Sequence, residues 1–345
     1  MKLFSTNFAE AYGRRLSFPQ KVSLYLRRKL ARPTKWDRAA RAWRAAHPAR
    51  ETFFLSHAFD AELPPDATIS PDFSSAPPAP APRVAVICHL FYDDLAAEIA
   101  ARLEAMPIPY RLCVTTDRPE KRARILAAMS GLPNAALEVR VTPNVGRDIA
   151  PKLVGFADAH RNADLVLHIH GKKSLHTPAH WGWREHILDR LLGRPGEGPG
   201  MISGALALFA ARSDLGILTA SEYAPAKERY IGHSGAYMVT LAEALGRPID
   251  FDDPIPDHPS GSMFWARRAA MEPLLNLRLG WADFGQELRQ YNGTLAHGVE
   301  HAYGISAELA GLRLLRIARP GDRGAASEAA RDLTSLCRAA QTQAS

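Results

Sequence analysis

The feature that most constrains the fold is a close alternation of short apolar runs and helical segments in the first half of the chain. Four runs have the composition of buried parallel strands, at residues 83–90, 110–115, 137–141 and 163–169. Segments with helical spacing separate them, at residues 93–106, 120–129 and 148–160. This order predicts an α/β fold in which a single open, mostly parallel sheet is flanked by helices.

Changes in composition divide the chain into four predicted parts. Residues 1–63 form a basic helical segment, and residues 64–82 form a Pro- and Ala-rich linker. Residues 83–318 form the main domain, and residues 319–345 form a C-terminal helix that ends in a flexible tail. With 345 residues, of which 46% are hydrophobic, the chain has ample material for a large core.

Cysteine content and hydropathy indicate the compartment. The three cysteines are odd in number and lack metal-ligand spacing, which favours a reducing environment over a disulfide scaffold. No run approaches the roughly 18 apolar residues that span a bilayer, and the N-terminus has no compact apolar core followed by a cleavage site. These observations predict a cytoplasmic protein.

The positive charge is concentrated near the N-terminus. The net charge is +7, yet residues 1–50 hold thirteen Lys and Arg against two acidic residues and so carry about +11. No base-reading module accompanies this charge, so we expect no nucleic acid partner. Tyr25, Trp36 and Trp43 interleave the cations, which favours peripheral attachment to the anionic inner face of the cytoplasmic membrane. The alternative is a pair of helices that pack on the main domain and keep their charges in solvent.

Ligands of open α/β sheets bind at the carboxyl ends of the strands. The polar residues expected there are His89, Thr115, Asp117, Asn144, Gly146, Arg147, Asp148, His168, His170, Lys172, Lys173 and Ser174. In residues 144–149, a glycine turn and an arginine precede a carboxylate that opens a helix, and such a turn can bind an anion through backbone N–H groups and the guanidinium. The alternative for this motif is a helix N-cap by Asp148 beside a surface arginine.

The segment 168–174 is the sharpest of these motifs. His168 and His170 alternate along a strand and so share one face, and Lys172 and Lys173 follow a glycine turn. Two lysines at a strand end beside another basic motif suit a diphosphate, although adjacent lysines can also be solvated. A zinc site is a weaker alternative, because no cysteine or carboxylate completes the ligand set. Its histidines would be His168, His170, His176 and His180.

Seven motifs occur in an order typical of one family, at residues 89–92, 114–117, 144–149, 168–174, 182–184, 261–265 and 292–297. By these motifs, residues 83–315 resemble the rhamnan synthesis protein F family of bacterial polysaccharide glycosyltransferases. The resemblance implies a hexosyltransferase that moves a sugar, typically rhamnose from dTDP-rhamnose, onto a growing cell-surface polysaccharide or lipid-linked glycan of the cell envelope, such as lipopolysaccharide. The sequence departs from the family at Asn292, where the family has an acid before Gly-Thr-Leu-Ala-His.

The resemblance also implies an architecture. Nucleotide-sugar transferases of this sheet type have either two similar nucleotide-fold halves or one sheet with the donor at its centre, and the roughly 230 residues from Arg83 fit the second, GT-A-like kind. There a strand normally ends in Asp-x-Asp, which holds a divalent metal, but here residues 165–170 end in histidine before the lysines. Because lysines can neutralise a departing diphosphate directly, we expect no metal and no cofactor. The acids at residues 250–253 remain an alternative metal site.

An inverting transfer requires a carboxylate that takes the proton of the acceptor hydroxyl. The predicted catalytic residues are Asp283, Glu287 and Asp257, with Glu300 as a further candidate. Asp283 and Glu287 would share one face of a helix, although Asp283 could instead be a helix N-cap. The residues assigned to the acceptor or the pocket wall are Trp183, Arg184, Ser262, Met263, Trp265, Asn292 and His297. Phe264 or Trp265 would either stack on a sugar ring or belong to the core.

Two other functions are open. A non-catalytic module that binds nucleotide sugars or glycans in an envelope-polysaccharide assembly complex would bind the donor without turnover. A metal-dependent hydrolase that uses the histidines would contain stoichiometric metal.

Overall fold

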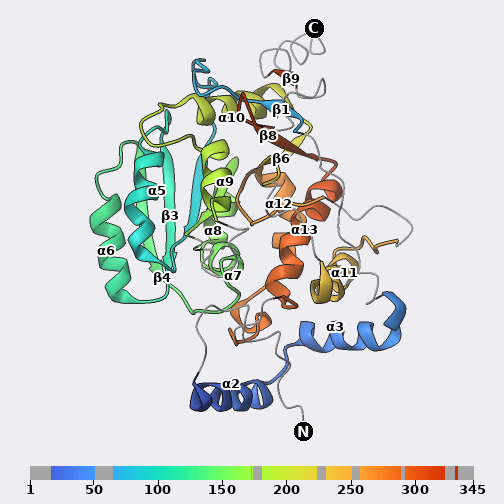
Figure 1. The fold of residues 1–345 in the computed structure, drawn as a ribbon. Helices are drawn as coiled ribbons and strands as arrows, with labels where there is room; N and C mark the ends of the chain where they lie inside the picture. Colours follow the sequence, from blue (N-terminus) through green and yellow to red (C-terminus); the bar gives the residue numbers. More distant parts are fainter. Residues whose placement is uncertain are drawn as a thin grey trace.

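The computed structural model describes residues 17–50, 65–171, 173, 181–223, 231–250, 257–288, 292–322 and 331–332. These residues form one sheet of nine strands in the order β4-β3-β2-β5-β7-β6-β8-β1-β9 (Figure 1). The strands are β1 Ala67–Thr68, β2 Val84–His89, β3 Tyr110–Thr116, β4 Ala135–Val141, β5 Leu165–His170, β6 Leu215–Ala220, β7 Phe264–Arg267, β8 Arg313–Ala318 and β9 Arg331–Asp332. Only β7 is antiparallel to its neighbours among these strands. The predicted α/β fold with a single, mostly parallel sheet is confirmed.

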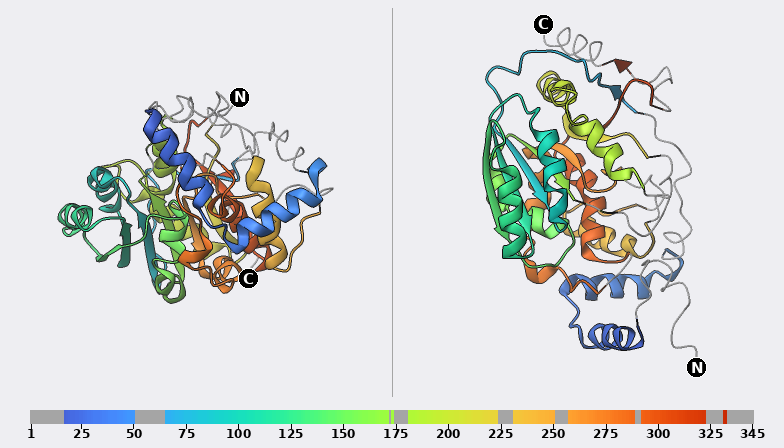
Figure 2. Two further views of the ribbon diagram at one scale, coloured as in Figure 1. Left: turned by 90° about the horizontal axis from the view of Figure 1, so that it is seen from below. Right: turned by 60° about the vertical axis from the view of Figure 1, so that its left-hand side comes forward.

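Helices cover both faces of the sheet (Figures 1 and 2). One face packs against α5 Ala96–Leu103, α6 Pro119–Met129, α9 Trp183–Leu191 and α10 Gly200–Ala211. The other packs against α7 Ile149–Leu153, α8 Ala157–Asn162, α11 Gly235–Ala244, α12 Arg268–Asn276 and α13 Leu295–Leu309. Short 3-10 turns occur at η1 Asp93–Leu95, η4 Gly232–Ser234 and η5 Trp281–Asp283. Because both faces are covered, β2 and β5 are buried along their whole length, which explains their continuous apolar runs.

The helix predicted over residues 148–160 is instead two helices, α7 and α8. Between them the chain turns at Gly155, which lies so close to the carbonyl oxygen of Pro151 that a Cβ atom would overlap it. The same Cβ would lie 3.0 Å from Cγ2 of Thr115 on β3. Glycine therefore lets the chain turn tightly over the sheet, where a longer regular helix was expected.

The two segments that flank the main domain both contribute short strands. Within the predicted linker of residues 64–82, β1 pairs in parallel with β8, and Ile69 is fully buried. At the other end, β9 pairs with β1. The prediction of a helix is therefore wrong at residues 331–332, because the edge of β1 offers unpaired N–H and C=O groups that the chain uses. Residues 323–330 and 333–345 lie outside the described part of the chain.

The basic N-terminal segment contains two helices, α2 Phe18–Leu30 and α3 Lys35–Ala46. Thr34 and Asp37 begin α3 with reciprocal side chain to backbone hydrogen bonds of 3.1 and 2.8 Å. Trp36 and Trp43 are buried with the core of the α11 side, and the Tyr237 hydroxyl donates to Asp37 at 2.6 Å. Thus α3 packs on the main domain, whereas α2 lies beyond it at one end of the molecule (Figure 2). In the described parts of the chain, no helix is long and apolar enough to cross a membrane.

Candidate functional site

The order of the strands reverses between β2 and β5, because β3 and β4 lie on one side of β2 and β5 lies on the other. Ligands of α/β sheets bind at the carboxyl ends of strands beside such a switch point. The register pairs His89 at the end of β2 with Thr115 on β3 and with His170 on β5. Three residues predicted to bind the donor therefore form one row at this edge of the sheet.

An ion pair lies beside this row, between the fully buried Lys152 and the partly buried Asp148. Lys152 on α7 has no exposed surface, and its Nζ lies 2.9 Å from Oδ2 of Asp148. His170 Nε2 is 3.7 Å from the same carboxylate oxygen, and His89 Nδ1 is 2.9 Å from the Thr115 hydroxyl. We call His89, Thr115, Asp148, Lys152 and His170 the switch-point cluster. Lys152 was not among the predicted residues, although its position four residues after Asp148 allows an i,i+4 ion pair.

The pKa values of Asp148 and His89 show which of the two side chains is charged and which is neutral. Burial alone would raise the pKa of the Asp148 carboxyl, but His170 and Lys152 outweigh it and hold that pKa well below its usual range. Burial lowers the pKa of His89 to about 4, against a smaller opposing effect of Asp148. At neutral pH the cluster therefore combines an ionised Asp148 carboxylate with a neutral His89.

The turn at Gly261 and Ser262 connects this cluster to the rest of the site. Both residues have positive φ angles, of 79° and 55°. The Ser262 carbonyl accepts from Lys152 Nζ at 2.6 Å, and the Gly261 carbonyl lies 2.7 Å from His170 Nε2. The Gly261 N–H donates to Glu300 Oε1 at 2.7 Å. A Cβ at Gly261 would lie 3.0 Å from Ile187 Cδ1, so glycine permits the close approach that the sequence motif predicted.

The turn in residues 144–149, which was predicted to bind an anion, instead binds the carboxylate of Glu287. Gly146 and Arg147 have φ angles of 69° and 56°, and the Arg147 N–H donates to Glu287 Oε1 at 3.0 Å. Burial raises the pKa of Glu287 above its usual value, against the opposing effect of Arg147. Glu287 therefore binds one of the N–H groups that the motif offers to a ligand, and Asn144 beside it is exposed.

The helix predicted to carry Asp283 and Glu287 on one face is absent. Asp283 ends the short turn η5, and the chain is then extended enough for Gln286 to form an antiparallel bridge with Val145. Asp283 accepts from the Gly280 N–H at 2.8 Å and from Trp36 Nε1 at 3.2 Å, and it forms an ion pair with Lys35. This carboxylate thus connects α3 to the main domain.

Other predicted polar residues form pairs around the edge of the site. Lys173 forms an ion pair with Asp94, and Asp117 lies 2.6 Å from Lys121 Nζ. The third pair, 2.9 Å apart, joins Arg184 to Glu98. The predicted residues outside the described part of the chain are Lys172, Ser174, His176, His180, Asp252 and Asp253. Among the described residues, His, Cys, Asp and Glu form no group of three or more that could hold a metal ion.

Several predicted residues are buried in the core. His168 has 0% of its surface exposed, and its ring lies 4.9 Å from that of His160 and 4.8 Å from that of Phe264. No ligand can reach His168 in this conformation. Phe264 and Trp265 also have no exposed surface, and Trp265 Nε1 donates to the Leu191 carbonyl at 3.1 Å, so both match the core alternative. Met263 and Ser262 are buried as well.

Residues of the motif at 292–297 form hydrogen bonds with neighbouring parts of the chain. The Asn292 amide forms a hydrogen bond with the Ser234 hydroxyl and donates to the Ile231 carbonyl at 3.2 Å. His297 Nδ1 lies 2.7 Å from the Thr294 hydroxyl at the start of α13. In the structure, Asn292 therefore connects two loops.

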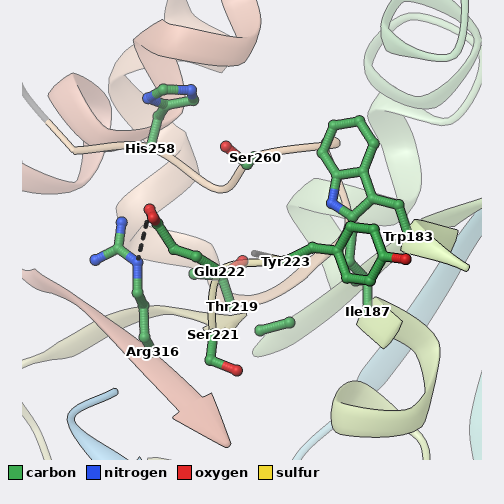
Figure 3. Close-up of a pocket in the computed structure, with 10 residues that line it drawn as sticks. Trp183, Ile187, Thr219, Ser221, Glu222, Tyr223, His258, Ser260 and Arg316 are labelled. Carbon is green, nitrogen blue, oxygen red and sulfur yellow. Dashed lines mark ion pairs between the residues drawn. The ribbon is translucent and has the colours of Figure 1, made fainter. Parts of the chain in front are cut away.

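A pocket opens at the carboxyl ends of β6 and β8 (Figure 3). Its lining residues are Trp183, Ile187, Thr219, Ala220, Ser221, Glu222, Tyr223, His258, Ser260 and Arg316. Only Trp183 was predicted here, and Asp257 reaches the pocket through its ion pair with Arg316. The rule that directed attention to strand ends would also have found Glu222, which comes two residues after β6.

The chain is similar in sequence to known proteins over most of its length. The sequence profile of Rhamnan synthesis protein F matches residues 67–310. A protein named WxcX from Xanthomonas campestris pv. campestris strain B100, described as uncharacterized, is 29% identical over 239 residues, which are 68% of this chain and 33% of that protein. WxcX of a second strain of the pathovar matches with the same identity and coverage. The chain thus spans about a third of the length of these relatives. Because the profile covers well over half of the chain, this protein belongs to the rhamnan synthesis protein F family.

Proposed function

We propose that the protein is a glycosyltransferase of GT-A-like fold, which transfers rhamnose or a related hexose from a nucleoside diphosphate to a cell-surface or lipid-linked glycan. Its family indicates a role in polysaccharide synthesis. The observation that carries the proposal is the row of His89, Thr115 and His170 at the switch point, where this type of sheet binds ligands. One sheet with one central switch point also agrees with a single-sheet transferase rather than with two nucleotide-fold halves.

In this proposal the donor lies over the carboxyl ends of β2, β3 and β5. Its diphosphate faces the segment after β5, where Lys173 follows the fully buried strand, and the lysines neutralise the departing charge without a metal. The ion pair of Asp148 with the fully buried Lys152 lies beside the row at the switch point. It holds the Gly261–Ser262 turn in place, and that turn forms the wall between the donor and the pocket beyond it.

A panel of dTDP-, GDP- and UDP-sugars tests the donor site by thermal unfolding. We expect at least one of them, dTDP-rhamnose first, to raise the melting temperature by several degrees, equally with and without EDTA, because ligand bound only to the folded state stabilises it. The double variant Lys172→Ala, Lys173→Ala should lose this protection.

The matched control is the double variant Arg268→Ala, Arg313→Ala, which removes two exposed positive charges at the opposite, amino-end edge of the sheet. It should keep the protection. Full protection of the lysine variant would show that the diphosphate binds elsewhere, and dependence on added metal would contradict metal independence.

A non-catalytic binding module is the second candidate. The observation in its favour is Asn292, which stands where the family has an acid and is hydrogen bonded to Ser234 and Ile231. Nucleotide release distinguishes the two candidates. A transferase releases nucleotide from the donor that protects it, whereas a binding module is protected by the donor and releases none with any acceptor.

We also propose that α2 attaches the protein to an anionic membrane surface. Four of the seven large hydrophobic side chains that are exposed among the described residues lie on this 13-residue helix. They are Val22, Tyr25, Leu26 and Leu30, and Leu26 and Leu30 are 50% and 79% exposed. Spacings of three and four residues place them along one side of the helix. Residues 18–34 contain basic residues and no acid, so the charge complements an anionic lipid surface.

Sedimentation with vesicles tests this attachment. The protein should bind vesicles that contain phosphatidylglycerol, bind less as salt is added, and bind pure phosphatidylcholine weakly. The double variant Leu26→Gln, Leu30→Gln should lose more than about tenfold in affinity, because each buried leucine contributes about 1.5–3 kcal/mol. The control Leu309→Gln changes an exposed leucine at the end of α13 and should bind as the wild type does. Equal binding of the double variant would exclude the apolar side of α2 as the contact.

A further inference from the structure

The two basic helices, α2 and α3, lie together at one end of the molecule, and the carboxyl edge of the sheet faces this end (Figures 1 and 2). One short segment connects α3 to that edge. A Cβ at Gly146, in the turn before α7, would lie 2.7 Å from Phe284 Cδ1. The neighbouring Asp283 accepts from Trp36 Nε1 of α3 at 3.2 Å. Since Asp148 of the switch-point cluster follows Gly146 by two residues, only this segment separates α3 from the loop that carries it.

The two sides of α3 differ in chemistry. Trp36, Ala40 and Trp43 follow one another at spacings of four and three residues, and all three are buried against the main domain. Arg38 and Arg41 are exposed. With about 3.6 residues per turn, these two arginines lie on the side opposite the tryptophans. The helix therefore packs on the domain with one side and presents positive charge to the solvent with the other.

These positive charges differ from those at the amino edge of the sheet. There Arg83, just before β2, lies 2.6 Å from the carboxylate of Asp164. Within the residues that the structure describes, neither Arg38 nor Arg41 forms an ion pair. Arg38 donates to the carbonyl of Pro33 at 2.8 Å, which leaves its charge uncompensated. The outer side of α3 thus offers two cations to an anionic partner.

We propose that α2 and the outer side of α3 form one membrane-binding surface, which holds the carboxyl edge of the sheet toward the bilayer, and that the acceptor is a glycan carried by a lipid of the same bilayer. The acceptor rests on the proposed transferase function, whereas the orientation does not. An anionic bilayer complements both helices, because its phosphates pair with the arginines of α3 and its apolar interior accepts the leucines of α2.

The orientation favours a lipid-bound acceptor over a soluble one. A glycan on a membrane lipid stays within its own length of the bilayer surface, so a site can reach it only from nearby. The switch-point cluster lies at the sheet edge that α3 adjoins, and it would therefore face this surface. Attachment of both the protein and the acceptor to one surface also raises the effective concentration of the acceptor.

Energy transfer from a labelled side chain to the bilayer tests the orientation. A fluorophore is attached to Asn144→Cys, beyond the carboxyl end of β4, or to Ala136→Cys at its amino end, and both positions are exposed. The background is Cys337→Ser, since Cys88 and Cys113 are buried. The two labels lie about 20 Å apart along the strand. On phosphatidylglycerol vesicles with rhodamine-labelled lipid, residue 144 should transfer more energy than residue 136. Equal transfer, or more from residue 136, would overturn the orientation.

The arginines of α3 test whether this helix belongs to the surface. The double variant Arg38→Gln, Arg41→Gln should bind phosphatidylglycerol vesicles about 20- to 30-fold more weakly at low salt, because each cation near such a surface strengthens binding about fivefold. The control Arg268→Gln, Arg313→Gln removes the same charge at the amino edge and should bind as the wild type does. Unchanged binding of the α3 variant, or an equal loss in the control, would remove α3 from the surface.

Nucleotide release from the protecting donor tests the acceptor. Hexadecyl glycosides of rhamnose, mannose, glucose and galactose in phosphatidylglycerol vesicles are compared with the methyl glycosides in solution. For at least one sugar, release should be about tenfold or more greater from the vesicles, and Leu26→Gln, Leu30→Gln should lose this excess but keep the release with the methyl glycoside. Release that is no greater from the vesicles would overturn the lipid-bound acceptor. If no nucleotide sugar protects any form, the proposed function fails, and the energy transfer still decides the orientation.

Discussion

Replacing Lys152 by methionine should lower the free energy of unfolding by about 3–5 kcal/mol, which is a large part of the stability of an ordinary domain. The lysine has no exposed surface, and its Nζ contacts both the Asp148 carboxylate and the Ser262 carbonyl. Methionine fills much of the same volume but leaves the partly buried Asp148 carboxylate without its lysine partner. Urea unfolding at pH 7 measures the loss.

A double-mutant cycle separates the ion pair from the packing of the side chain. Adding Asp148→Asn to Lys152→Met should recover part of the stability, because the carboxylate that lost its partner is then also removed. The control Lys35→Met breaks the ion pair of a largely exposed lysine with Asp283 and should change stability by less than about 1 kcal/mol. A loss below about 1 kcal/mol in Lys152→Met would contradict the structural importance of the ion pair between Lys152 and Asp148.

The central sheet could be predicted because burial on both faces leaves a direct trace in the sequence. The strands β2, β3 and β5 are continuous apolar runs, and their order brings His89, Thr115 and His170 together as the rule of strand ends predicted. The family resemblance is confirmed as well. Both the strands and the family motifs are short contiguous segments, so their own residues are enough to predict them.

The errors arose where contacts between distant segments decide the structure. The four-residue spacing of Asp283 and Glu287 is compatible with a helix, but the bridge from Gln286 to Val145 keeps the chain extended there. Lys152 was not singled out in the sequence, and lysine is almost never fully buried unless it is paired. The pairing depends on where α7 packs over the sheet, which no local pattern shows.

His168 also shows that contacts with distant segments cannot be predicted from a local pattern. Its alternation with His170 places both residues on one side of β5. Their environments differ, because His170 lies at the end of the strand near Gly261, whereas His168 is covered by Tyr303 of α13 at a ring distance of 6.0 Å. The period of the strand thus predicts the face, while the position of a helix far along the chain decides which residue a ligand can reach.

The buried histidines should make the fold sensitive to mild acid. Burial lowers the pKa of His89 and of His160 to about 4, and it lowers the pKa of His168 well below its ordinary value. An unfolded histidine titrates near 6.5, so below this pH the unfolded chain binds more protons than the folded chain. Stability is therefore fully present above about pH 6.5 and is lost as the pH falls toward 4. At pH 5, each of these three histidines should have lowered the free energy of unfolding by about 2 kcal/mol.

Measurements between pH 7 and pH 5 isolate the histidines from most carboxylates. The low pKa of Asp148 reduces stability only when the pH approaches the value of an unfolded aspartate, about 3.9. Glu287 acts in the opposite direction, because its raised pKa lets the folded state bind a proton first.

The free energy of unfolding, from urea titrations at a series of pH values, should fall by several kcal/mol between pH 7 and pH 5. In His160→Gln the fall should be smaller by about 2 kcal/mol. A free energy of unfolding that stays constant from pH 7 to pH 5 would contradict the neutral, buried state of these rings.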